Sequence, residues 1–87
     1  MNLKVTIIDM KMKTITLYVD KSVTIGFLRN LFREKGGDGI NNQWKCDGRI
    51  LDDDDIKLEN VQGFDPEEMA ITVTTNVRGG YLINKYN

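Results

Sequence analysis

Three stretches of alternating apolar and polar residues constrain the fold of this 87-residue chain more than any other feature. They cover residues 3–7, 15–19 and 69–77, and a period of two is typical of a strand with one buried face. The first two stretches are separated only by Asp9–Lys13, a connection short enough for a hairpin. The sequence therefore predicts an antiparallel pair of strands at the start of the domain and a third strand near its end.

A single helix is predicted between the hairpin and the later strands. Ile25, Leu28 and Phe32 are three and four positions apart, the spacing of one apolar helical stripe. Thr24 precedes them and is a residue type that favours the N-cap. The run Lys35-Gly36-Gly37 predicts the end of the helix, because glycine adopts the left-handed conformation of a C-terminal cap and lysine suits the negative end of the helix dipole.

The middle of the chain adds shorter elements. Gln43–Cys46 predicts a strand closed by the turn Asp47-Gly48, and Arg49–Leu51 predicts a brief further strand. One turn of helix near residues 56–61 is expected to bring Leu58 and Val61 onto the core. This order predicts an α+β domain in which one helix covers one face of a sheet. The first and last strands are expected to lie side by side, parallel, at the centre.

Composition excludes several classes of function. The chain has one cysteine and no histidine, which argues against most metal sites and against catalytic triads with a histidine base. The net charge of −1 offers no field to attract nucleic acid or an acidic membrane. No run approaches the roughly 20 apolar residues of a membrane span, and the N-terminus lacks a signal-peptide core. We expect a monomer without cofactors or enzymatic activity, located in the cytoplasm, the nucleus or both.

The order and spacing of short motifs resemble the ubiquitin-like modifier family. Lys13–Leu17 has the same five residues as the start of the second strand of ubiquitin, and Thr24 matches its helix-capping threonine. Gly48 and Leu51 match positions in the strand-turn-strand segment, and Arg78–Gly80 matches the end of the mature modifier. The resemblance covers nearly all of residues 1–80. It implies the β-grasp fold, a mixed sheet of four to five strands with one helix packed across it.

The resemblance also implies a function for the C-terminal segment. Residues 1–77 would form the domain, 78–80 the Arg-Gly-Gly conjugation motif and 81–87 an extension. A protease would cleave after Gly80, and activating and conjugating enzymes would then join Gly80 to a lysine amine of a target protein. Gly79 and Gly80 suit this chemistry because a backbone without Cβ atoms passes through a narrow enzyme channel. The partner enzymes would supply the nucleophilic cysteine.

Two other functions remain open at this stage. If residues 81–87 are permanent, the chain has no free glycine carboxylate and is a non-conjugated interaction domain, either alone or within a longer polypeptide. A sulfur carrier of the same fold is a third reading, and the extension argues against it because such carriers usually end at the glycines.

Several positions depart from the family pattern. Lys45, Thr72 and Thr74 replace the apolar patch that ubiquitin presents to its receptors, so we expect ordinary ubiquitin-binding modules not to recognise this face. Asn76 replaces an arginine that the activating enzyme reads together with the position of Arg78. We therefore expect poor charging by the ubiquitin enzyme and a dedicated enzyme instead.

Lysine, arginine, cysteine and aspartate positions give further expectations. Lys13 and Lys35 fall at lysine positions of ubiquitin and are the candidate acceptors for chain formation, although a solvated surface is the favoured interpretation. Arg49 stands where the main chain-forming lysine would be, and a guanidinium does not accept an acyl group. Cys46 is expected to be a partly buried structural thiol, and the run Asp52–Asp55 lacks the ligand spacing of a calcium loop.

Overall fold

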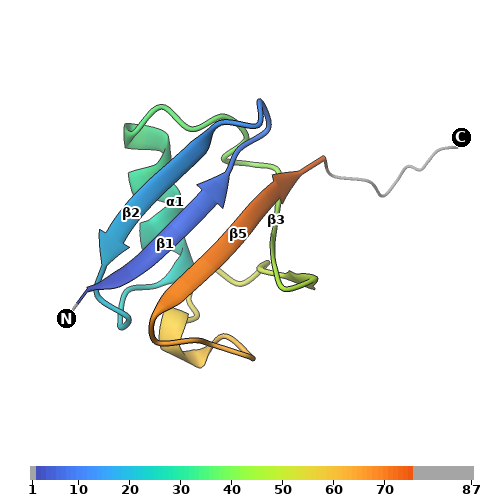
Figure 1. The fold of residues 1–87 in the computed structure, drawn as a ribbon. Coiled ribbons are helices and arrows are strands. Elements are labelled where there is room, and N and C mark those ends of the chain that lie inside the picture. Colours follow the sequence, from blue (N-terminus) through green and yellow to red (C-terminus); the bar gives the residue numbers. More distant parts are fainter. Residues whose placement is uncertain (1, 76–87) are drawn as a thin grey trace, which may run out of the picture.

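The computed structural model describes residues 2–75, which form a five-stranded mixed sheet with one helix across a face (Figure 1). The strands lie in the order β2-β1-β5-β3-β4. Their bounds, with those of the helix α1 and the 3-10 turn η1, are β1 Leu3–Ile8, β2 Thr14–Val19, α1 Ile25–Glu34, β3 Gln43–Cys46, β4 Arg49–Ile50, η1 Leu58–Asn60 and β5 Glu68–Thr74. This is the architecture of a ubiquitin-like β-grasp, and the predicted fold class is confirmed.

The N-terminal hairpin forms as its alternation predicts. β1 and β2 pair antiparallel from Leu3 opposite Val19 to Ile8 opposite Thr14. The alternating residues 3, 5 and 7 of β1 and 15, 17 and 19 of β2 are buried, while the residues between them and Ile8 are exposed or half-buried on the other face. The connecting loop reverses at Met12, whose φ of 65° lies in the left-handed region.

β1 and β5 lie side by side and parallel at the centre of the sheet, as expected. β5 is shorter than the predicted strand, which extended through Thr75 to Val77. It ends at Thr74, opposite the first residue of β3, Gln43, and β1 has already ended opposite Thr72. No neighbouring backbone among the described residues continues the ladder past that point, so the strand stops. Val77 lies outside the described residues.

The ends of α1 agree with the predicted caps. The Thr24 hydroxyl accepts a hydrogen bond from the N–H of Phe27 at 3.2 Å, which satisfies one free donor of the first turn. Lys35 is the C-cap, and Gly36 follows with a φ of +82°. Glycine tolerates this conformation because it has no Cβ.

The core lies between α1 and the inner face of the sheet. Ile25, Leu28 and Phe32 of α1 are buried against it, and the Phe32 ring meets Trp44 of β3 edge-on with centroids 4.8 Å apart. Leu58 and Val61, from η1 and the residue after it, close the core at one end. Trp44 fills the core as well, and the positions of Leu58 and Val61 confirm the core roles predicted for them.

Candidate functional site

The outer face of the sheet is covered by no helix in the described residues and carries the residues predicted to replace the apolar patch (Figure 1). Strand register places Lys45 of β3 next to Thr72 of β5, and Thr72 next to Ile8 of β1. Thr74 points to the same face because it is two residues beyond Thr72. The structure therefore brings the three predicted residues together on one exposed surface.

This surface is polar at its centre and has an apolar residue toward each side. Lys45 is flanked by Thr72 on β5 and by Ile50 on β4, and Ile8 lies on the far side of Thr72. Ile8 is half-buried, whereas Ile50 is exposed. A continuous apolar patch is absent from this row of the described sheet, because a lysine and a threonine separate the two isoleucines.

The end of β5, from which the C-terminal segment continues, is held firmly. Val73 and Thr74 pair with Trp44 and Gln43 of β3. The Trp44 indole N–H donates to the carbonyl of Gly39 at 3.3 Å, so the loop after α1 is fastened beside this strand end. Thr75, the last described residue, is exposed. The predicted conjugation residues Arg78, Gly79 and Gly80, and the recognition residue Asn76, lie outside the described residues.

A buried carboxylate fixes the neighbouring hairpin loop. Asp9, 1% exposed, accepts hydrogen bonds from the backbone N–H groups of Lys11, Lys13 and Asp38 at 2.9, 2.8 and 3.1 Å. Burial alone would raise the pKa of this carboxyl, but the bonds from Lys13, Asp38 and Lys11 together lower it below its ordinary value. The ionised carboxylate therefore joins the hairpin to the segment that follows α1.

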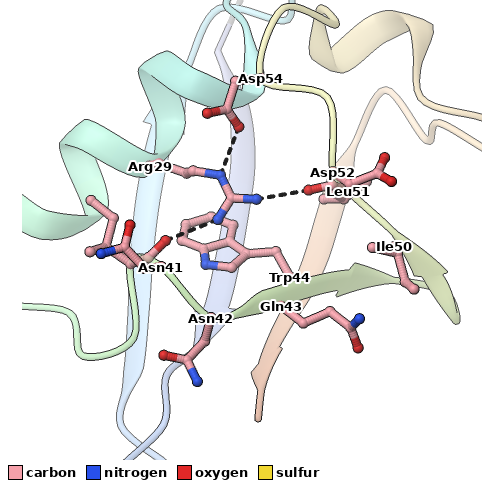
Figure 2. Close-up of a pocket in the computed structure, with 10 residues that line it drawn as sticks. Arg29, Asn41, Asn42, Gln43, Trp44, Ile50, Leu51, Asp52 and Asp54 are labelled. Atoms are coloured by element: carbon pink, nitrogen blue, oxygen red, sulfur yellow. Dashed lines mark hydrogen bonds and ion pairs between the residues drawn. The ribbon is translucent and has the colours of Figure 1, made fainter. Parts of the chain in front are cut away.

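A second polar centre lies around Arg29 of α1 (Figure 2). Its guanidinium donates to the Asp54 carboxylate at 2.9 Å and to the carbonyls of Ile40 and Leu51 at 3.1 and 2.8 Å. It also lies over the Trp44 ring, 4.7 Å from the centroid. An open hollow of about 550 Å³ adjoins this group. Three donors of Arg29 are thus committed to protein acceptors, which makes it a structural clamp between loops.

The remaining candidate residues have simple environments. Lys13 donates from Nζ to the carbonyl of Gly36 at 2.9 Å, and Lys35 is exposed at the C-cap of α1. Arg49 is exposed on β4. Cys46 is buried, and burial, reinforced by the charge of Asp47, raises the pKa of its thiol. A neutral buried thiol agrees with the structural role predicted for it.

Residues 2–75 contain no group of three or more histidine, cysteine or acidic side chains arranged to hold a metal ion. No helix within this range is long and apolar enough to cross a bilayer.

Sequence reasoning did not single out Asp9 or Arg29. The sequence does indicate the position of Asp9. It continues the alternation of Leu3, Val5 and Ile7, whose side chains face the core, so its own side chain is expected to face the core too. Arg29 offered no such local signal, because its acceptors come from residues 40, 51 and 54 and meet only in the folded chain.

Solved structures confirm the fold class. The chain is similar to the solution NMR structure of the ubiquitin-like domain of an Arabidopsis thaliana protein. The match has a TM-score of 0.72 and 23% sequence identity, and it covers 88% of this chain and 80% of that one. No protein-family model matches the sequence, and no curated protein matches it. At this level of identity the likeness concerns the ubiquitin-like fold alone.

Proposed function

We propose that this chain is the precursor of a ubiquitin-like protein modifier, processed after Gly80 and joined through that residue to lysines of target proteins. One observation carries the proposal: an Arg-Gly-Gly sequence at 78–80 follows the central strand of a β-grasp sheet. β5 is held between β1 and β3, so the segment after Thr75 starts from a fixed point on the surface.

The chemistry requires only an acyl group from this chain. The Gly80 carboxylate released by a protease would attack the α-phosphate of ATP and displace pyrophosphate. A cysteine thiolate of the activating enzyme would then displace AMP to form a thioester. After transfer to a conjugating enzyme, a target lysine amine would attack the thioester carbonyl, form the isopeptide bond and release the thiol. The chain itself would be no enzyme, and its place of action would be the cytoplasm or nucleus.

Gly80 is five positions beyond Thr75, a reach of at most about 18 Å when the chain is extended. The polar outer face around Lys45 supports recognition by dedicated enzymes rather than by those of ubiquitin.

The test uses a chain with one epitope tag before Met1 and a different tag after Asn87, expressed in cells that contain the cognate enzymes. We expect the second tag to be removed, the intact mass to correspond to an end at Gly80, and higher-mass adducts to appear on denaturing gels. Gly80→Ala should abolish the adducts. Asn84→Ala, a matched change in the extension, should leave them.

Retention of both tags on every species, with no adduct that depends on Gly80, would overturn the proposal. It would leave the non-conjugated interaction domain as the function of the fold.

A further inference from the structure

A small apolar hollow lies beside β4 and the loop that follows it. Buried Ile25, Leu51 and Val61 form its floor, and Ile50 and Ile56, which are 49% and 38% exposed, stand at its sides. Its volume is about 270 Å³. This is slightly below the range of small-molecule pockets, about 300–1,000 Å³, so the hollow suits one or two side chains of a protein partner.

The charges around the hollow define the chemistry of that partner. Asp52 and Asp53 line it, and Asp55 lies two residues further along the same loop. The only ion pair within residues 2–75 joins Arg29 to Asp54, so these three carboxylates have no cationic partner in that range. Arg49 lines another part of the rim. The hollow therefore suits a partner segment in which an apolar side chain has positively charged residues on either side.

The chain carries such a segment on its own hairpin. Met12 is 79% exposed, the most exposed large hydrophobic residue of the described chain, and Lys11 and Lys13 are exposed on either side of it. Asp9 holds this loop through its hydrogen bonds to Lys11 and Lys13, so the tip is presented in an ordered conformation. Methionine adapts well to irregular apolar cavities.

The hairpin tip and the hollow of one molecule do not meet. The hairpin of β1 and β2 forms one edge of the sheet, and β4 forms the opposite edge (Figure 1). A contact between them has to join two molecules.

We propose that a second copy of this chain inserts its tip, Lys11-Met12-Lys13, into the hollow between Ile50 and Ile56. The contact is head-to-tail, so each molecule uses its tip on one neighbour and its hollow on another. Such a contact builds a ring when the rotation between neighbours closes and an open chain when it does not. The contact is small, which makes the association weak, and its ion pairs make it sensitive to salt. This self-association would replace the expectation that the chain is a strict monomer. The inference does not depend on the proposed conjugation through Gly80.

Two variants of the full chain separate the two halves of the contact. Met12→Asp removes the apolar tip and adds a repelling charge, and aspartate tolerates the left-handed backbone at this position. Ile50→Thr combined with Asp52→Lys removes one wall of the hollow and reverses a rim charge. The matched control combines Tyr18→Thr with Glu67→Lys, a comparable pair of changes at exposed positions outside both surfaces.

Sedimentation velocity over a range of concentrations gives the readout. At low ionic strength we expect the average sedimentation coefficient of the wild type and the control to rise with concentration. The rise should disappear near 1 M salt, where charges are screened within about 3 Å. Each surface variant alone should remain monomeric. Their equimolar mixture should form a dimer and nothing larger, because one intact tip then meets one intact hollow.

The formation of a dimer in the mixture also shows that both variants are folded. The proposal is overturned if the wild type stays monomeric at millimolar concentration and low salt. It is equally overturned if the surface variants associate like the wild type, or if their mixture forms no dimer.

Discussion

Asp9 and Arg29 each satisfy three partners with one charged side chain, and each joins loops that are distant in sequence. Asp9 holds the hairpin loop against Asp38, and Arg29 holds α1 against the segments around Ile40 and Leu51. A buried charge is tolerated when its hydrogen bonds are satisfied, and removing it leaves several backbone groups without partners. Single substitutions at these two residues are therefore expected to loosen the loops before they disturb the sheet.

Replacing Asp9 by asparagine should weaken the fold in a pH-dependent way. The pKa of Asp9 is lowered by folding, so its contribution to stability is present above its ordinary pKa of 3.8 and is lost as the pH falls through the lower folded value. We expect Asp9→Asn to reduce the free energy of unfolding most at neutral pH, with the difference from the wild type shrinking below about pH 4. Urea unfolding across this pH range measures the effect.

The matched control for this experiment is Asp65→Asn. Asp65 is exposed and accepts one backbone hydrogen bond, from Glu67 at 2.8 Å. It should change stability far less than Asp9→Asn. An equal effect of the two substitutions at every pH would show that the Asp9 carboxylate does not hold the loops.

The three hydrogen bonds donated by the Arg29 guanidinium should contribute more to stability than its ion pair with Asp54. The Arg29 side chain is 15% exposed, whereas that of Asp54 is 60% exposed. Arg29→Lys keeps the charge but cannot reach three acceptors, and we expect a loss of about 1–3 kcal/mol in unfolding free energy. Asp54→Asn should cost less than about 1 kcal/mol, as exposed ion pairs do. Chemical denaturation of both variants tests this, and a larger loss for Asp54→Asn would contradict it.

At the scale of secondary structure, local signals predicted most of the elements. The alternation of β1, β2 and β5 and the spacing of α1 each depend on neighbours in sequence, and these elements appear where the patterns place them. The end of β5 was predicted at a residue too far along the chain. Its true position depends on where the neighbouring strands β1 and β3 end, and the local sequence pattern does not indicate that. The exposure of Ile50 and Ile56 was also not predicted, since isoleucine in a strand or next to a helical turn usually indicates the core.

The N-cap of α1 offers a direct test of one local signal. Thr24→Ala removes the acceptor for the N–H of Phe27 and should lower the free energy of unfolding by about 1 kcal/mol. Thr24→Ser keeps an oxygen at the same place and should retain most of the stability. Thermal unfolding of the two variants distinguishes them, and equal losses would argue against capping by the hydroxyl.

The turn after α1 depends on close packing at Gly37. A Cβ at this residue would lie 2.4 Å from the Phe32 ring, which is too close for any real contact. Gly37→Ala should therefore cost about 1–3 kcal/mol through overpacking. Adding Phe32→Leu, which removes ring atoms at that point, should make the combined loss smaller than the sum of the two single losses. Strict additivity in denaturant unfolding would contradict this packing.

At the scale of the whole molecule, the sheet separates a core face from an outer face, and the period of two predicted which residues lie on each. Lys45 and Thr72 lie side by side on the outer face. The alternation of residues predicts this position but does not predict which partner binds there, because that depends on the chemistry of the partner. The Arg-Gly-Gly sequence at 78–80 was interpreted as a conjugation motif from resemblance alone. The proposed conjugation would depend on enzymes outside this chain.

The polar outer face leads to a binding prediction. In NMR titrations with a ubiquitin-binding module, the wild type should show no saturable shifts at micromolar concentrations. The double substitution Lys45→Ile and Thr74→Val should create an apolar patch on this face and increase binding measurably. Tyr18→Val, an apolar change on the β2 side of the same face, is the control and should not. Micromolar binding of the wild type through Lys45, Thr72 and Thr74 would contradict the prediction.

The central claim, that Gly80 is an acyl donor, is tested most directly by the linkage itself. Adducts of an N-terminally tagged chain are purified under denaturing conditions and digested with a protease that cleaves after lysine. Because residues 58–80 contain no lysine, a conjugated target should carry the whole segment Leu58–Gly80 on a lysine amine, a remnant that ubiquitin does not leave. Mass spectrometry that finds this branched peptide confirms the account. Tagged chains that all end at Asn87, with no branched peptide, contradict it.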